Sequence, residues 1–224
     1  EFSHYLMGGM DKLFMNYVLK PAWVKQLSEM ISQYKCKVLE NAAKVGADAL
    51  LTGDDYAGRK GSFMSPLHFR QFVQPYLKRA VRIAKQSNLP FIKHTDGNLK
   101  EILEMIVDTG IDALDPIEPM AGMDIGEIKQ KYGDRICIVG NVDCTEVLPH
   151  GTREDVEEAV KETIAKASGG GGHILASSNS IHPAVKAENY KNMIDTVRKY
   201  GVYPLDAGMI KRYKTHKYIT KFGG

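Results

Sequence analysis

The chain has few cysteines, little net charge and no long hydrophobic run. Its 3 cysteines among 224 residues are too few, and odd in number, for a disulfide framework, so we expect a reducing, cytoplasmic setting. A net charge of +3 gives no reason to expect a nucleic-acid partner. No apolar run approaches the ~20 residues of a membrane-spanning helix, so we expect no membrane insertion. A hydrophobic content of 43% is ordinary for a globular domain and excludes global disorder.

Two phosphate-binding signatures are also missing. The sequence contains neither Gly-x-Gly-x-x-Gly between a strand and a helix nor a phosphate loop ending in Gly-Lys-Ser/Thr. The glycine run at 169–172 precedes an apolar segment rather than a helix, so we interpret it as a turn. These absences favour a barrel over a dinucleotide-binding fold.

Short apolar segments alternate with amphipathic ones along the chain. The expected strands cover 49–52, 91–94, 112–114, 136–139 and 173–176. The expected helices cover 11–20, 21–45, 66–87, 99–108, 124–132, 153–167 and 186–200. Continuous apolar strands are typical of parallel sheets that are covered on both faces. In the helix of 21–45, one apolar stripe that we expect to be buried contains Trp23, Leu27, Met30, Ile31, Tyr34 and Val38.

This alternation predicts an α/β fold with about five strand–helix units, whereas a complete (β/α)8 barrel has eight in ~250 residues. We therefore expect a partial (β/α)8 TIM barrel that holds the C-terminal units and lacks the N-terminal strands. The expected barrel domain covers 1–203, and 204–224 is expected to form a solvated basic C-terminal tail.

Polar side chains cluster directly after the expected strands. The clusters are Asp54-Asp55, His94-Thr95-Asp96, Asp115, Asn141 with Asp143, and Ser177-Ser178-Asn179. The carboxyl ends of parallel strands share one face of the sheet, and ligands bind there in barrels and open sheets alike. The sequence therefore predicts a ligand site built from these loops.

Two of the clusters suggest specific chemistry. His94 and Asp96 are two residues apart, so both can point toward the barrel mouth and ligate a hard metal through nitrogen and oxygen. Asp54 and Asp55 are adjacent, so only one of them is expected to enter the pocket, and the sequence does not distinguish them. A neighbouring carboxylate raises the pKa of such a group and suits it to proton transfer. The alternatives are that Asp96-Gly97 is simply a turn with His94 packed beside it, and that Asp54 and Asp55 cap local backbone amides.

Several segments together resemble the uroporphyrinogen decarboxylase superfamily. They are the segments at 53–58, 64–66, 93–98, 140–143 and 172–176, and the resemblance extends from about residue 5 to about residue 201. The resemblance implies a (β/α)8 barrel whose N-terminal part lies outside this sequence. The superfamily contains the haem-pathway decarboxylase and methyltransferases that pass methyl groups to or from corrinoid proteins.

The two branches differ in the residues that they need. The decarboxylase has Gly-His-Gly after its last strand, where this chain has Asn179 in place of the histidine and His182 three residues further on. The methyltransferases hold zinc with His-x-Cys and a later Cys, where this chain has His94 and Asp96 and no cysteine in the last loop. The usual thiol-activating zinc site is therefore absent, although His94 and Asp96 would still hold zinc or another divalent metal.

The resemblance implies three alternatives. The first is a methyltransferase that moves a methyl group between a small methylated substrate and a corrinoid protein. The second is a uroporphyrinogen decarboxylase, which removes carboxyl groups from a tetrapyrrole in porphyrin biosynthesis and needs no cofactor. The third is a non-catalytic binding remnant of the barrel. Family members form homodimers, so self-association is also expected.

The expected site residues fall into two groups. Those expected to be catalytic are Asp54, Asp55, His94 and Asp96. Those expected to bind substrate are Tyr5, Asp115, Asn141, Asp143, Ser178, Asn179 and His182. Tyr5 is included because a family tyrosine precedes a Gly-Gly turn, and Asn141 because Gly140 allows a close backbone approach.

Overall fold

Five short strands form one sheet in the computed structural model, which describes residues 2–223. Their order is β1-β4-β5-β6-β7, with β1 (Leu50–Gly53), β4 (Phe91–His94), β5 (Ala113–Asp115), β6 (Cys137–Val139) and β7 (His173–Ile174). The pairs β1–β4 and β6–β7 are parallel. A separate two-stranded sheet contains β2 (Ala57–Gly58) and β3 (Gly61–Ser62). The parallel sheet and its alternating helices confirm the predicted α/β class and the partial barrel.

The backbone divides into two units. The first contains the chain up to Ala57 together with Gly61–Thr95 and Leu99–Ala113. The second contains Gly58–Lys60, Asp96–Asn98 and the chain from Leu114 onward. No helix in the described part of the chain is long and apolar enough to cross a membrane.

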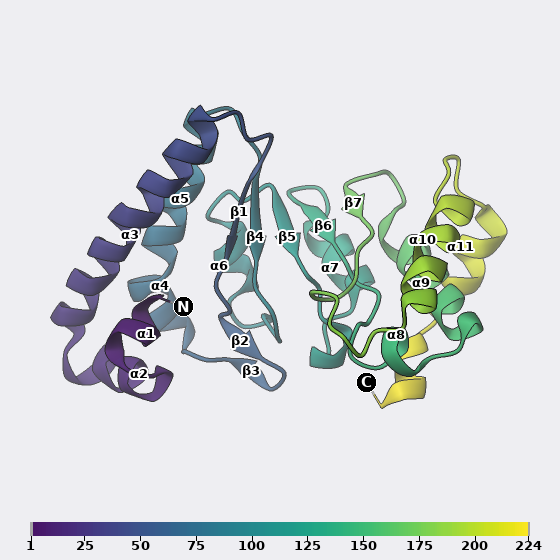
Figure 1. Cartoon of the computed structure of the whole chain (residues 1–224), viewed down its shortest axis with the longest axis horizontal. Helices are drawn as coiled ribbons and strands as arrows, with labels where there is room; N and C mark the ends of the chain where they lie inside the picture. Colours follow the sequence, from purple (N-terminus) through teal and green to yellow (C-terminus); the bar gives the residue numbers. More distant parts are fainter. Residues whose placement is uncertain (1, 224) are drawn as a thin grey trace. The chain divides into compact units, whose positions relative to one another are not determined.

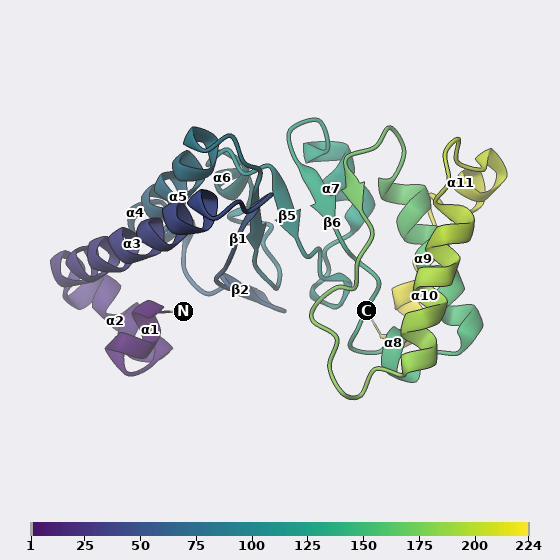
Figure 2. The same cartoon turned by 45° about the horizontal axis from the view of Figure 1, so that its top comes forward.

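In the first unit, helices pack beside β1 and β4. These helices are α1 (Phe2–Met7), α2 (Met10–Leu19), α3 (Pro21–Lys44), α4 (Pro66–Phe72), α5 (Gln74–Gln86) and α6 (Leu103–Val107). The long helices α3 and α5 lie against each other, and they contact β1 and β4 respectively (Figure 1). α1 and α2 pack near one end of α3 (Figure 2), and Leu13, Tyr17, Val24 and Phe72 form a small core there.

Two expected helices of this unit differ in extent. The helix predicted over 66–87 begins as expected at Ser65, whose hydroxyl accepts a hydrogen bond from the His68 N–H at 3.2 Å. It is interrupted at Val73, because Pro75 has no N–H for the helical ladder. The helix predicted over 99–108 contains only Leu103–Val107, since the residues before it form turns.

The buried face of α3 is not the stripe that we expected. Val24 is fully buried, and Ser28, Ser32, Cys36 and Leu39 share its face. The expected stripe is largely exposed, with Trp23, Met30, Tyr34 and Val38 between 46% and 63% accessible. Small serine side chains let α3 approach its neighbours closely, whereas the larger apolar side chains are only partly covered, for example Tyr34 by Phe2 and Trp23 by Lys20.

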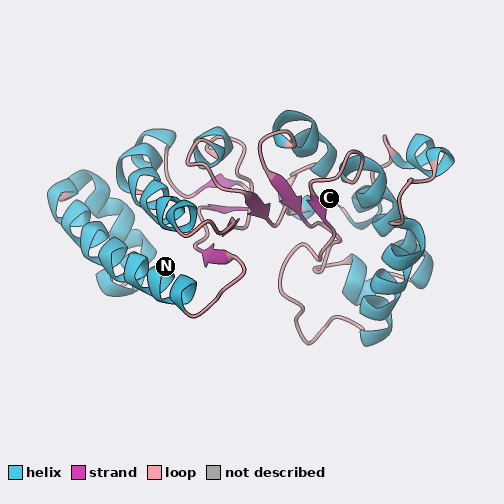
Figure 3. Ribbon diagram, turned by 90° about the horizontal axis from the view of Figure 1, so that it is seen from above, coloured by secondary structure: helices cyan, strands magenta, loops and turns pink. Residues whose placement is uncertain are grey.

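In the second unit, helices surround the long helix α9. The elements are η1 (Pro119–Ala121), α7 (Ile125–Tyr132), α8 (Val147–His150), α9 (Arg153–Ala167), α10 (Ala187–Tyr200), α11 (Ala207–Tyr213) and η2 (Tyr218–Phe222). α9 contacts α7, α8, α10, α11 and η2, and Figure 3 shows these helices in cyan beside short magenta strands. The predicted capping box is confirmed, because Thr152 and Asp155 satisfy each other's backbone N–H.

The chain from residue 204 onward is not the solvated tail that we expected. Met209, Tyr213 and Tyr218 are buried in the core of the second unit. The lysines and arginines of this segment alternate with apolar side chains at helical spacing. The charge of the segment alone therefore did not predict its burial.

A buried carboxylate anchors this segment. Glu162 is 5% exposed, and its Oε2 accepts the Tyr218 N–H at 2.7 Å and pairs with His216 Nδ1 at 2.7 Å. Its Oε1 accepts from Lys166 Nζ at 2.9 Å, and the same ammonium group reaches Asp124 at 2.8 Å. Removing either partner would leave an uncompensated buried charge, so the contacts of this segment with Glu162 are costly to break.

The exposed and buried faces of α3 predict unequal mutational costs. Val24→Ala is expected to lower the free energy of unfolding by about 2 kcal/mol, because it removes buried methyl groups and leaves a cavity. Met30→Ala, on the exposed face, is expected to cost less than about 0.5 kcal/mol. Urea denaturation followed by circular dichroism measures both. Equal losses would contradict the burial described here and would show that Met30 is covered in solution.

Candidate functional site

The parallel register of β1 and β4 aligns the loops that follow them. Gly53 pairs with His94, so Asp54 and Asp55 leave β1 at the level where β4 ends. The β4 side chains alternate, with Phe91 and Lys93 buried and His94 half-buried on the other face. The strand ends therefore present Asp55 and His94 on adjacent segments of one unit.

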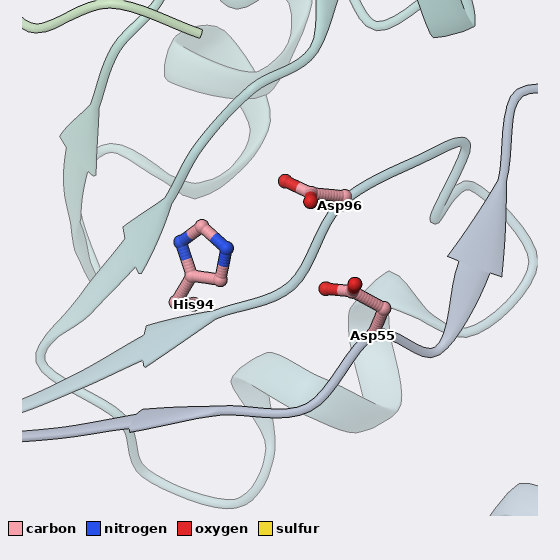
Figure 4. A group of neighbouring side chains, drawn as sticks. All are labelled: Asp55, His94 and Asp96. Carbon is pink, nitrogen blue, oxygen red and sulfur yellow. The ribbon is translucent and has the colours of Figure 1, made fainter. Parts of the chain in front are cut away.

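Asp55, His94 and Asp96 form a group of three possible metal ligands. One ligand atom from each residue lies within 4.8 Å of the others, and Figure 4 shows both carboxylates pointing toward the imidazole ring. Asp96 follows His94 after a single residue, so chain connectivity alone holds these two close together. The predicted pair of His94 and Asp96 is thus brought together. The structure also distinguishes Asp55, rather than Asp54, as the third member.

A cavity of about 160 Å³ lies within the first unit, and Asp55 is the member of this group that lines it. Its walls include Asp54, Asp55 and Tyr56 after β1 and side chains from α1, α2, α3 and α5. Tyr17 from α2 also lines it, and its ring stacks on Phe72 at a centroid distance of 4.4 Å. Burial raises the pKa of Tyr17 to about 12, so its hydroxyl stays protonated and able to donate. Sequence reasoning missed Tyr17, because it follows Phe14 at the spacing of core residues.

Tyr5 lies outside this cavity. It is 73% exposed on α1, and its ring contacts that of His4 at a centroid distance of 4.3 Å. The cavity wall from α1 consists of Phe2, Ser3 and His4 instead. The sequence placed Tyr5 by its distance from a Gly-Gly turn, and that distance does not determine which way a helical side chain points.

Asn141 and Asp143 are buried in the second unit and bonded inward. The Asn141 Oδ1 accepts from the Thr163 hydroxyl at 3.3 Å. The Asp143 Oδ1 accepts from the backbone N–H groups of Thr145, Glu146 and Val147 at 3.2, 2.6 and 3.1 Å. Asp143 therefore holds the turn that leads into α8, which is a structural role that the sequence did not separate from substrate binding.

The last loop is also tied to its own unit. Ser178 is 1% exposed, and its hydroxyl accepts the Cys144 N–H at 3.1 Å. His182 is exposed; its Nε2 donates to the Cys144 carbonyl at 2.8 Å while its Nδ1 accepts from the Ala184 N–H at 3.3 Å. Burial raises the pKa of the Cys144 thiol, so this cysteine is an unreactive core residue.

Asn179 and Glu118 brace the loop that contains Asp96. The Asn179 Nδ2 donates to Asp96 Oδ2 at 2.7 Å, and the Glu118 carboxylate accepts the Gly97 N–H at 3.0 Å. Burial raises the pKa of Glu118, the Gly97 N–H opposes this shift, and the charge of Asp96 adds to it. Sequence reasoning did not select Glu118, which lies three residues beyond Asp115, itself half-buried at the end of β5.

The comparisons with known proteins identify the family. Residues 2–200 match the family model described as uroporphyrinogen decarboxylase (URO-D), so the chain belongs to this family. It is 32% identical over 181 residues to a uroporphyrinogen decarboxylase of Chlorobium luteolum, covering 79% of this chain and 48% of that one. It is 31% identical over 211 residues to the Chlorobium phaeovibrioides protein of the same name, covering 88% and 56%.

A solved structure supports the fold. A methyltransferase from Methanosarcina mazei superposes with a TM-score of 0.72 at 24% identity, covering 86% of this chain and 54% of the other. At this identity the likeness shows the fold alone, and that fold is the barrel expected from the sequence. The chain spans about half the length of the curated relatives that it matches.

The role of Asp143 as an acceptor for backbone N–H groups is testable. Asp143→Ala is expected to lower the free energy of unfolding by about 1–2 kcal/mol, because three backbone N–H groups lose their acceptor. Asp143→Asn should lose less, since its amide oxygen can still accept. Thermal and urea denaturation measure the difference. An Asp143→Ala protein with wild-type stability would contradict this role and return Asp143 to the substrate-binding candidates.

Proposed function

We propose that this chain is the metal-holding part of a methyltransferase of the URO-D family, which acts on a small methylated compound and passes the methyl group to a corrinoid protein. The observation that carries the proposal is the convergence of Asp55, His94 and Asp96 at the ends of β1 and β4. The remaining part of the barrel would complete the enzyme, since this chain spans about half of its relatives.

The donor set suits a divalent metal. One imidazole nitrogen and two carboxylate oxygens are ligands of zinc and of harder divalent ions. With no cysteine among them, the group does not fit the thiolate site expected of thiol-activating relatives. A bound metal would act as a Lewis acid on the heteroatom that carries the methyl group.

The chain's own side chains would position the substrate. Asp55 belongs both to the donor group and to the cavity wall, so a molecule in the cavity would lie beside Asp55. Tyr17 would donate a hydrogen bond from its protonated hydroxyl. Asn179 would hold Asp96 through the 2.7 Å hydrogen bond, which orients one carboxylate oxygen.

The size of the cavity favours a small substrate. A volume of about 160 Å³ is close to that of an engineered cavity of about 150 Å³ that binds benzene. A small methylated compound therefore fits the cavity of the first unit.

Uroporphyrinogen decarboxylation is the second candidate, and the names of the curated relatives favour it. The key acid of that reaction would then lie outside the matched half. Assays of this chain and of the full gene product separate the alternatives. Methylation of cob(I)alamin from a methoxybenzene donor supports methyl transfer, and formation of coproporphyrinogen supports decarboxylation. Ligand binding without either product would favour a non-catalytic remnant.

The metal site makes a direct prediction. Titration calorimetry with Zn²⁺ is expected to show one ion per chain, with affinity falling on acidification because protons compete for the imidazole. His94→Ala and Asp96→Ala are each expected to weaken binding by more than about 10-fold, the loss typical of a removed outer-shell partner. Asp55→Ala should behave in the same way. Exposed His150 provides the control, and His150→Ala should bind as the wild type does.

Two outcomes would overturn the metal assignment. One is the absence of stoichiometric metal in the wild-type chain and in the full gene product. The other is undiminished binding in His94→Ala, which would place the ion elsewhere. Circular dichroism spectra of all variants show whether a lost ion reflects a lost fold.

A further inference from the structure

Lys93 is a fully buried lysine within the strand that ends in His94. Its exposed fraction is 0%, although it lies one residue from a half-buried candidate ligand. Lysine is almost never fully buried unless its charge has partners, because removing an ammonium group from water is costly. The contacts of Lys93 are therefore with its neighbours in the first unit.

The ammonium group of Lys93 joins the two strand ends. Its Nζ donates to the backbone carbonyl of Asp54 at 3.0 Å and to that of His94 at 2.7 Å. It also lies 4.4 Å from the centroid of the Tyr56 ring, over which it makes a cation–π contact. Hydrogen bonds from a charged donor are shorter and stronger than neutral ones, and burial strengthens them further.

Thr95 makes a second link between the same two segments. Its hydroxyl oxygen accepts the backbone N–H of Tyr56 at 3.0 Å, and Thr95 itself is 0% exposed. We call Lys93, Thr95, Tyr56 and the Asp54 carbonyl the clasp. All four belong to the first unit.

The clasp brackets two of the candidate ligands. Asp55 lies between Asp54 and Tyr56, and His94 lies between Lys93 and Thr95. The flanking residues on one segment therefore bond to the flanking residues on the other. Asp55 is exposed and His94 is half-buried, whereas Lys93 and Thr95 have no exposed surface.

We propose that Lys93, with Thr95, is a positioning residue that fixes Asp55 and His94 at ligand-binding separation. This inference rests on the proposed function. A chain that lost the clasp would keep both ligands but would have to order two loops on binding, which costs conformational entropy. Lysine suits the role because one point charge with three rotatable donors reaches two carbonyls and a ring face, whereas the planar fork of arginine does not.

A purely electrostatic role makes the opposite prediction. A buried cation near a metal site repels the ion, so its removal would tighten metal binding. Loss of positioning weakens it. The sign of the change in Lys93→Met therefore separates the two roles.

The test uses Co²⁺ as a spectroscopic probe on the intact chain. Lys93→Met is expected to weaken Co²⁺ binding about 10- to 100-fold, the range for outer-shell partners of metal ligands, and to alter the visible absorption of the bound ion. The matched control is Lys78→Met, on the exposed surface of α5 in the same unit, which should leave affinity and spectrum unchanged.

Thr95 supplies a second pair of variants in case Lys93→Met does not fold. Thr95→Val keeps the side-chain shape and removes the acceptor for the Tyr56 N–H, so weaker Co²⁺ binding is expected. Thr95→Ser keeps the hydroxyl and should restore most of the affinity that Thr95→Val loses. Wild-type affinity and spectrum in folded Lys93→Met, or in Thr95→Val, would overturn the inference, as would tighter binding.

Hydrogen exchange separates this inference from the proposed function. If the wild type binds no Co²⁺, the proposed function fails, yet the clasp can still be judged without metal. The Tyr56 amide is then expected to exchange faster in Thr95→Val and Lys93→Met than in the wild type and Lys78→Met. Unchanged exchange at Tyr56 would show that the two segments are held by other contacts, and Lys93 would lose its positioning role.

Discussion

The parallel pairing of β1 with β4 is the constraint on which the candidate site depends. Its register sets Gly53 opposite His94, and every later relation in the first unit follows from that alignment. Because side chains alternate along a strand, a slip of one residue would exchange the buried position of Lys93 for the ligand position of His94. The ammonium group would then lose its contacts with the Asp54 carbonyl and the Tyr56 ring, and the imidazole would leave the group that it forms with Asp55. The register is therefore specified by chemistry on both faces of one strand.

Adjacent residues of the site have different roles. Residues at alternate positions are either fully buried and bonded to backbone groups, as Lys93 and Thr95 are, or half-buried with a possible metal-ligand atom, as His94 is. In the second unit, polar residues that follow the strands are bonded to groups of the same unit. Asp143 and Asn141 have the residue types of a ligand site, but their side chains satisfy buried N–H and hydroxyl groups. Polar residues after parallel strands thus have either a structural role or a possible ligand-binding role, and their burial distinguishes the two.

Local sequence patterns predicted those features that depend only on neighbouring residues. The caps at Ser65 and Thr152 begin helices where expected, since a cap depends on residues within one turn. The pairing of His94 with Asp96 was also accessible, because two residues of one loop stay close whatever surrounds them. The choice of Asp55 over Asp54, the inward role of Asp143 and the buried face of α3 depend on distant parts of the chain. The burial of Tyr218 against Glu162 also depends on a distant part of the chain, so no local pattern predicts it.

The position of Trp23 has a practical consequence. It is the only tryptophan of the chain, and it lies half-exposed on α3 in the first unit. Intrinsic tryptophan emission therefore reports on one unit alone, and from a surface where unfolding changes the indole's surroundings little. Melting of the second unit, with its core around α9, would pass unseen by this probe. A tryptophan placed at buried Tyr218 would give that unit a fluorescent signal of its own, and the two signals together would show whether the units unfold as one.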